Sequence, residues 1–102
     1  VVYCENDNIA FGAIQALEER GYTCGPGGVE IITFDATRGA LAECLEGRIS
    51  LAVECDPLLG PLVEEVIQAM EAGQVPAKHQ YPEEQLFTAA DLSEALLAER
   101  AY

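Results

Sequence analysis

The residues best suited to chemistry in this chain are polar side chains that directly follow three apolar segments. Residues 5–7 (Glu-Asn-Asp) follow the first segment, Asp35 follows the second, and residues 54–56 (Glu-Cys-Asp) follow the third. The ends of neighbouring parallel strands meet at one edge of a sheet, which is where open α/β proteins bind ligands. Carboxylates accept hydrogen bonds from hydroxyl groups and asparagine both donates and accepts, so this edge suits a neutral polyol.

Some of these polar residues also have a simpler structural interpretation. Asp7 or Asn8 can cap the helix that follows the first strand, and Asp56 stands where a helix N-cap is expected. Asn6 and Asp35 are not needed as caps, because residues after them serve that purpose. We therefore predict that the side chains of Asn6 and Asp35 are free to contact a ligand.

The elements that must position these residues follow from the spacing of apolar side chains. Apolar, β-branched and aromatic runs predict strands at residues 1–5, 29–34 and 49–53. Helical spacing predicts helices at residues 9–20, 38–46 and 57–72, the second of them capped by Thr37. Three strand–helix units joined by short loops require a parallel sheet with right-handed crossovers. The predicted fold class is α/β, with a three-layer α/β/α arrangement.

The third predicted helix carries the longest apolar stripe, which we expect to be buried. This stripe consists of Leu59, Leu62, Val63, Val66, Ile67 and Met70. Beyond Gly73 two prolines interrupt the pattern, and residues 85–87 suggest a short extended piece. Thr88 with Asp91 makes a capping box for a last helix. We expect residues 1–75 to form a βαβαβα core and residues 76–102 to form a crossover segment and that helix.

Composition excludes several classes of partner. The chain has 18 acidic and 5 basic residues and a net charge of −13, which repels nucleic acid and anionic lipid surfaces. Four cysteines and one histidine show no zinc-site spacing, so we expect no metal and no cofactor. Cys4, Cys44 and Cys55 fall in apolar or amphipathic segments, where cysteine acts as a small hydrophobic residue. A neutral ligand is easier to accommodate.

Four segments resemble the type 1 periplasmic binding protein superfamily, in particular the sugar receptors of ribose and galactofuranose importers. These segments are ENDNIAFGAIQAL at residues 5–17, IITFDAT at 31–37, LEGRISLAVECDPLLGP at 45–61 and EEQLFTAADL at 83–92. The resemblance implies a Rossmann-like half of one lobe, from the C-terminal part of such a receptor. It also implies that Asn6 and Asp35 bind sugar hydroxyls and that the third strand contributes near Cys55. Ribose-type receptors resemble this chain with glutamine at that position, which leaves Glu54 or Asp56 to replace the glutamine contact.

The resemblance also implies a role. It is that of the solute-binding component of an ABC importer, not an enzyme, which delivers a monosaccharide to a membrane permease. The expected compartment is periplasmic or extracytoplasmic, with a lipid anchor if the source is Gram-positive. The effector-binding domain of a LacI-type transcription regulator is the alternative, because it shares the fold and the strand-end residues. A small enzyme or phosphoacceptor domain built around Asp35 is a third hypothesis.

Because the first strand lacks upstream partners, we also expect this chain to self-associate and to bind sugar weakly by itself.

Overall fold

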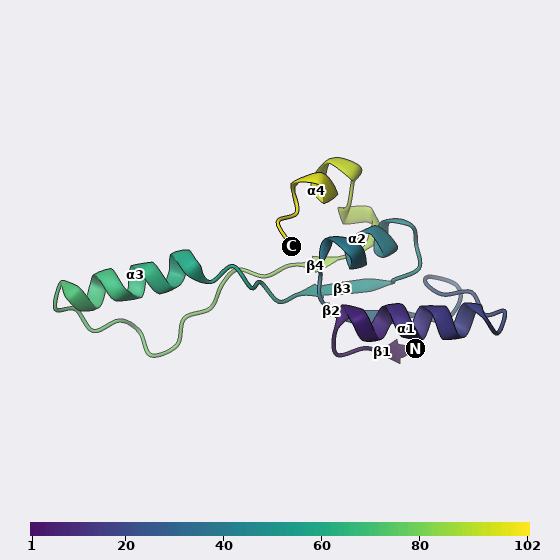
Figure 1. Cartoon of the computed structure of the whole chain (residues 1–102), viewed down its shortest axis with the longest axis horizontal. Helices are drawn as coiled ribbons and strands as arrows, with labels where there is room; N and C mark the ends of the chain where they lie inside the picture. Colours follow the sequence, from purple (N-terminus) through teal and green to yellow (C-terminus); the bar gives the residue numbers. More distant parts are fainter.

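The structure is a computed structural model that describes all 102 residues and contains one four-stranded sheet (Figure 1). The strands, in their order across the sheet, are β1 (Val2–Tyr3), β2 (Ile31–Asp35), β3 (Leu51–Glu54) and β4 (Leu86–Phe87). β1, β2 and β3 are parallel, whereas β4 pairs antiparallel with β3. The predicted α/β fold class and the parallel pairing of the first three strands are confirmed.

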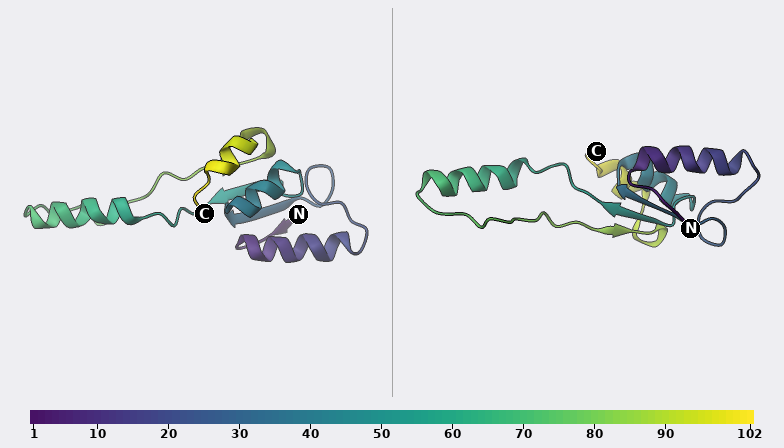
Figure 2. Two further views of the ribbon diagram at one scale, coloured as in Figure 1. Left: turned by 45° about the horizontal axis from the view of Figure 1, so that its top comes forward. Right: turned by 90° about the horizontal axis from the view of Figure 1, so that it is seen from below.

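Helices cover one face of this sheet. They are α1 (Asp7–Glu18), α2 (Arg38–Leu45) and α4 (Glu94–Glu99), with the 3-10 turn η1 (Ala89–Asp91) beside them. Figure 2 shows α1 and α2 on the same side of the strands. Alternate strand residues, including Ile31, Thr33 and Ala52, point into this layer and are fully buried there. The core therefore lies between the sheet and this single layer of helices.

The predicted cap of α2 is confirmed, and the predicted capping box is present but caps a different element. Thr37 accepts a hydrogen bond from the N–H of Ala40 at the start of α2, and Thr88 forms a capping box with Asp91. That box caps η1, whereas α4 has its own N-cap at Ser93. The last helical segment is thus divided in two, because the chain is extended at Leu92.

The opposite face of the sheet is open. The strand residues that alternate with the buried ones face this side of the sheet. Two of them, Tyr3 and Leu86, are 63% and 62% exposed. The ring of Tyr3 contacts that of Phe34 on the neighbouring strand, with 5.3 Å between ring centroids. This chain supplies one helical layer of the expected α/β/α arrangement, and an apolar sheet surface remains where the other layer is expected.

Residues 55–85 form an arm that stands away from the sheet and carries α3 (Gly60–Glu71) (Figure 1). The molecule is consequently elongated, with extents of 61 × 26 × 17 Å. The arm also contains residue 75, where we expected a boundary. No helix in the chain is both long and apolar enough to span a bilayer.

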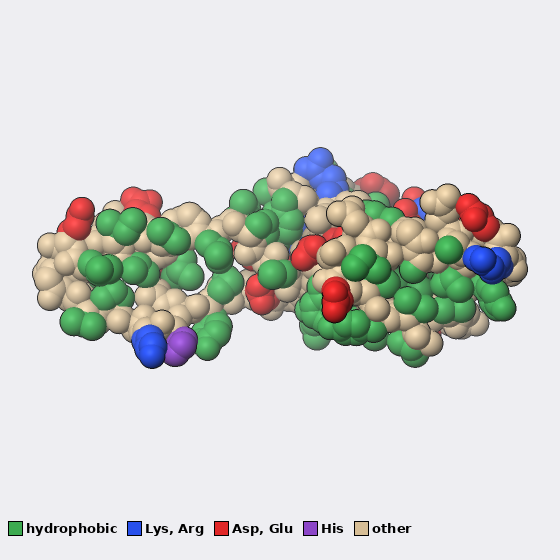
Figure 3. Space-filling model, turned by 60° about the horizontal axis from the view of Figure 1, so that its bottom comes forward, with side chains coloured by type: hydrophobic (Ala, Val, Ile, Leu, Met, Phe, Trp, Pro, Cys, Tyr) green, Lys and Arg blue, Asp and Glu red, His purple; other side chains and the backbone are tan.

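The prediction that the apolar stripe of α3 is buried is wrong for this chain. No residue of α3 is buried, and Ile67 and Met70 are 51% and 61% exposed. Figure 3 shows hydrophobic side chains gathered on the arm as well as on the body. The helix also begins at Gly60, because Asp56 accepts a hydrogen bond from the N–H of Leu58 and closes a turn instead of capping a helix.

Candidate ligand-binding site

The carboxyl ends of β1, β2 and β3 lie side by side, as the strand-end pattern predicts. Asp35 is in register with Glu54 on the neighbouring strand. The N–H of Cys55 is 3.4 Å from the carbonyl oxygen of Asp35, which continues the pairing one residue past β3. The end of β1 leads directly to Asn6 and α1. One edge of the sheet therefore presents the polar residues identified in the sequence.

Neither Asn6 nor Asp7 has only the role that we predicted for it: Asn6 caps α1, and Asp7 is a buried hydrogen-bond acceptor instead of the cap. Asn6 is the N-cap of α1, because its Oδ1 accepts the N–H of Ile9 at 3.0 Å. Asp7 is only 2% exposed. Its carboxylate accepts hydrogen bonds from the hydroxyl of Thr33 at 2.8 Å and from both the N–H and the hydroxyl of Thr37. The prediction that Asn6 is not a cap is thus wrong, although its amide NH2 group has no partner within the chain.

Asp35 has the most unusual backbone at this edge. Its φ is 99° and that of Ala36 is 56°, and these are the two non-glycine residues with positive φ. Such conformations cost free energy for side chains other than glycine, and they concentrate at functional sites. Asp35 is half-buried, and its carboxylate forms no hydrogen bond within the chain. Of the three predicted contact residues with side-chain oxygens, Asp35 is thus the one whose whole polar group is unused.

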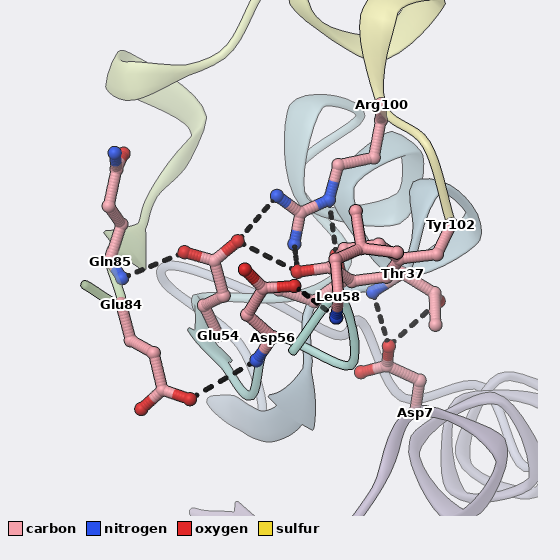
Figure 4. Close-up of polar contacts among 10 residues, drawn as sticks. Asp7, Thr37, Glu54, Asp56, Leu58, Glu84, Gln85, Arg100 and Tyr102 are labelled. Carbon is pink, nitrogen blue, oxygen red and sulfur yellow. Dashed lines mark hydrogen bonds and ion pairs between the residues drawn. The ribbon is translucent and has the colours of Figure 1, made fainter. Parts of the chain in front are cut away.

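Glu54 is the centre of a buried hydrogen-bond network (Figure 4). Its Oε1 accepts hydrogen bonds from Arg100 at 2.6 Å and from the hydroxyl of Tyr102 at 2.8 Å. Its Oε2 accepts the N–H of Gln85 at 2.9 Å. Both carboxylate oxygens therefore have partners, and Glu54 joins the end of β3 to the segment entering β4 and to the last residues of the chain.

The pKa values in this network reflect the partners. Burial opposes ionisation of Glu54, but the hydrogen bonds from Arg100 and Tyr102, the positive charge of Arg100 and the Gln85 N–H outweigh it. The pKa of Glu54 therefore lies below its ordinary value. Burial and the hydrogen bond to the Glu54 carboxylate raise the pKa of the Tyr102 phenol above its ordinary value. At neutral pH, Glu54 is a carboxylate, and the Tyr102 hydroxyl keeps its proton and donates a hydrogen bond to it.

The cysteines differ in accessibility. Cys4, Cys24 and Cys44 are buried free thiols, whereas Cys55 is exposed at the strand-end edge. Burial, with the nearby charge of Asp91, raises the pKa of the Cys44 thiol to about 11. The prediction that Cys4 and Cys44 act as small hydrophobic residues is confirmed, and for Cys55 it is wrong because the chain leaves the sheet there and enters the arm.

Sequence reasoning missed two residues that shape this edge, Arg100 and Tyr102. The guanidinium group of Arg100 lies over the Tyr102 ring, 4.1 Å from its centroid, and its Nε donates to the carbonyl oxygen of Ala36 at 3.0 Å. Both residues lie more than 40 positions from Glu54 in the chain, and no local motif marks them. The only sequence signal was that Arg100 is one of five basic residues in a strongly acidic chain.

Comparison with known proteins places the fold among sugar-binding proteins. No family model matches the chain. A fructose import binding protein of Bifidobacterium longum is 32% identical over 95 residues, which is 93% of this chain and 28% of that protein.

Two solved structures extend the comparison. The periplasmic binding protein component of the arabinose ABC transporter from Shewanella sp. ANA-3, bound to L-arabinofuranose, is 27% identical with a TM-score of 0.76. The match covers 98% of this chain and 33% of that protein. A galactofuranose binding protein is 25% identical with a TM-score of 0.78, over 97% of this chain and 33% of its own.

The matched region is only part of each relative. The chain spans about a third of the length of the proteins that it matches. Over that length, sequence and fold agree with each other and with the four segments identified above. In sequence and in fold, this chain is therefore similar to one segment of sugar-binding periplasmic proteins, as the resemblance to the type 1 superfamily predicts.

Proposed function

We propose that this chain supplies one wall of a monosaccharide-binding cleft and that Asp35 is its principal sugar contact. The observation that carries this proposal is the half-buried Asp35 carboxylate, which lies at the carboxyl edge of the sheet without a partner and on a strained backbone. A carboxylate has enough lone pairs to accept hydrogen bonds from two adjacent sugar hydroxyls. A sugar thus supplies the hydrogen bonds that the chain itself does not provide.

The other predicted contacts contribute unequally. The free amide NH2 of Asn6 is suited to donate to a sugar oxygen while its Oδ1 caps α1. Cys55 is exposed beside Asp35, where its thiol offers a weak donor and a surface for van der Waals contact. Glu54 is less suited to direct contact, because Arg100, Tyr102 and Gln85 occupy its oxygens.

The relatives support a particular class of ligand and role. Their names specify fructose, arabinofuranose and galactofuranose, which favours a monosaccharide in its furanose form. They are import binding proteins, which supports the receptor hypothesis over the LacI-type regulator. In this proposal the protein binds without catalysis, works outside the cytoplasm and passes its sugar to an ABC permease. The remainder of the cleft comes from segments that the relatives contain beyond the matched third.

Nuclear magnetic resonance titration of the chain tests the sugar contact. D-fructose, L-arabinose and D-galactose are added at millimolar concentrations, because one wall of a cleft binds weakly. We expect amide signals of Asn6, Asp35 and Cys55 to shift with at least one sugar, and Asp35→Ala to abolish the shifts. Glu30→Ala is the matched control, since it removes an equal charge just before the other end of β2.

Two results would contradict the proposal. In the first, Asp35→Ala leaves the titration unchanged. In the second, none of the sugars shifts the spectrum of the chain or raises the melting temperature of the complete gene product that contains it. The second measurement uses the linkage between binding and stability, which reports on the whole cleft.

A further inference from the structure

The loop that presents Asp35 needs support, because its conformation is unfavourable. Two consecutive residues without glycine's freedom, Asp35 and Ala36, have φ values of 99° and 56°. Ala36 is also fully buried. Backbone in this region persists only where surrounding contacts hold it in place. The contacts that hold this loop therefore determine where the Asp35 carboxylate stands.

Three successive residues of the loop are held from three directions. The carbonyl oxygen of Asp35 faces the N–H of Cys55 at 3.4 Å. The carbonyl oxygen of Ala36 accepts the Nε–H of Arg100 at 3.0 Å. The N–H of Thr37 donates to Asp7 at 2.8 Å, as Figure 4 shows. Of these three contacts, the one from Arg100 comes from the residue most distant in sequence.

Arg100 is itself held in a single orientation. Its Nη1 donates to Glu54 and its Nη2 to the Tyr102 hydroxyl, each at 2.6 Å. Its guanidinium group lies over the Tyr102 ring, and the centroid of the Phe87 ring lies 5.5 Å from its central carbon. The side chain is only 12% exposed. A planar guanidinium with all three nitrogens engaged is a rigid donor to Ala36, which the flexible ammonium of lysine cannot reproduce.

We propose that Arg100 is a positioning residue for the ligand site: it fixes the left-handed Asp35–Ala36 conformation through the Ala36 carbonyl, and Glu54 and Tyr102 orient it. This inference rests on the proposed role of Asp35 in sugar binding. Glu54, which the sequence suggested as a contact, then acts on the sugar through Arg100 and not by touching it. Holding the loop before the sugar arrives removes an ordering cost from binding.

Arg100→Lys separates positioning from folding, because it keeps a positive charge beside Glu54 but loses the fixed Nε donor. Sugar affinity is measured by the titration described above, with D-fructose, L-arabinose and D-galactose. We expect Arg100→Lys to weaken binding about tenfold, equivalent to about 1.4 kcal/mol. The matched control is Arg48→Lys. Arg48 pairs with Glu43 ahead of β3, at the opposite edge of the sheet, and its replacement should leave affinity unchanged.

The spectra of the free chains give a readout that does not depend on sugar. We expect the amide signals of Asp35, Ala36 and Thr37 to move in Arg100→Lys and to stay in place in Arg48→Lys. Unmoved signals in Arg100→Lys overturn the proposal, and so does an affinity equal to that of the unmodified chain. If no sugar binds the unmodified chain or the complete gene product, the proposed function fails while the amide signals still decide the positioning role.

Discussion

Replacing Glu54 with leucine measures how much the buried network contributes to folding. The side chains of Arg100 and Glu54 are only 12% and 9% exposed, so removing Glu54 leaves a guanidinium charge with little solvent. Removing one partner of a buried ion pair costs about 3–5 kcal/mol. The total stability of a small domain is about 5–15 kcal/mol. Glu54→Leu should therefore remove a large fraction of the stability, measured by urea unfolding followed by circular dichroism.

The matched control is Glu43→Leu, which breaks a pair whose members Arg48 and Glu43 are 39% and 24% exposed. Solvent screens such pairs, and they contribute about 1 kcal/mol or less. The double variant Glu54→Leu/Arg100→Met should recover much of the loss, since it leaves no unpaired charge. Equal losses for Glu54→Leu and Glu43→Leu would refute the reasoning, because the network would then be as screened as a surface pair.

The unmodified chain and Glu54→Leu together also test how stability depends on pH. The pKa of Glu54 is lowered in the folded chain. Its contribution to the free energy of unfolding is therefore complete above the ordinary pKa of 4.5, and it is lost as the pH falls through the lower pKa of the folded chain. The stability difference between the unmodified chain and Glu54→Leu should thus shrink below about pH 4.5. Other carboxylates titrate in both chains, so the difference isolates Glu54. A difference that grows on acidification would contradict the direction of the shift.

Three further predictions concern other parts of the molecule. At pH 8, Ellman's reagent should label Cys55 rapidly and the three buried cysteines only after unfolding; four equally fast thiols would contradict the fold. Asp7→Ala should lower the free energy of unfolding in urea by about 2–4 kcal/mol, because it leaves the donors of Thr33 and Thr37 without their acceptor. A decrease as small as that of Glu94→Ala, at an exposed position, would argue against this network. Sedimentation should show self-association that strengthens with salt, because salt screens the charge of −13. It should weaken in Ile67→Glu on the exposed face of α3, whereas a monomer at all salt concentrations would exclude this interface.

The parts of the fold that the sequence predicted are those set by local pattern. The run from Val29 to Phe34 is β-branched and apolar, and a strand forms there with a shift of two residues at its start. Thr37 caps α2 because its side chain reaches the first free N–H groups of that helix. Both features depend only on neighbours within a few residues, so periodicity and capping rules suffice.

The choice between Asn6 and Asp7 shows where local rules stop. Successive residues at a helix start point about 100° apart, so a shift of one position exchanges the cap for a core residue. Asp7 is turned inward because Thr33 and Thr37 offer three hydrogen bonds there. Those partners are 26 and 30 residues away in sequence, and the pattern of residues 5–8 contains no information about them.

The stripe on α3 shows a different limit. Spacing correctly predicts an amphipathic helix, but it does not say which surface covers the apolar face. In this chain α3 stands on the arm, and the apolar face of the sheet is also uncovered. The left-handed turn at Asp35 and Ala36 was equally unpredictable, because no glycine or asparagine marks it.

Glu54 joins the base of the arm to the carboxyl edge of the sheet, where Asp35 lies, and this arrangement limits how the arm and that edge affect each other. Its backbone N–H and its Oε2 both bind Gln85, where the returning arm enters β4. Its Oε1 binds Arg100, which holds the loop beside Asp35. The two connections of the arm are thus tied together on the body side, before α3 begins. We therefore expect that a change in the direction of the arm beyond these ties leaves Arg100 and the Asp35 loop in place, so the proposed wall of the cleft would keep its shape.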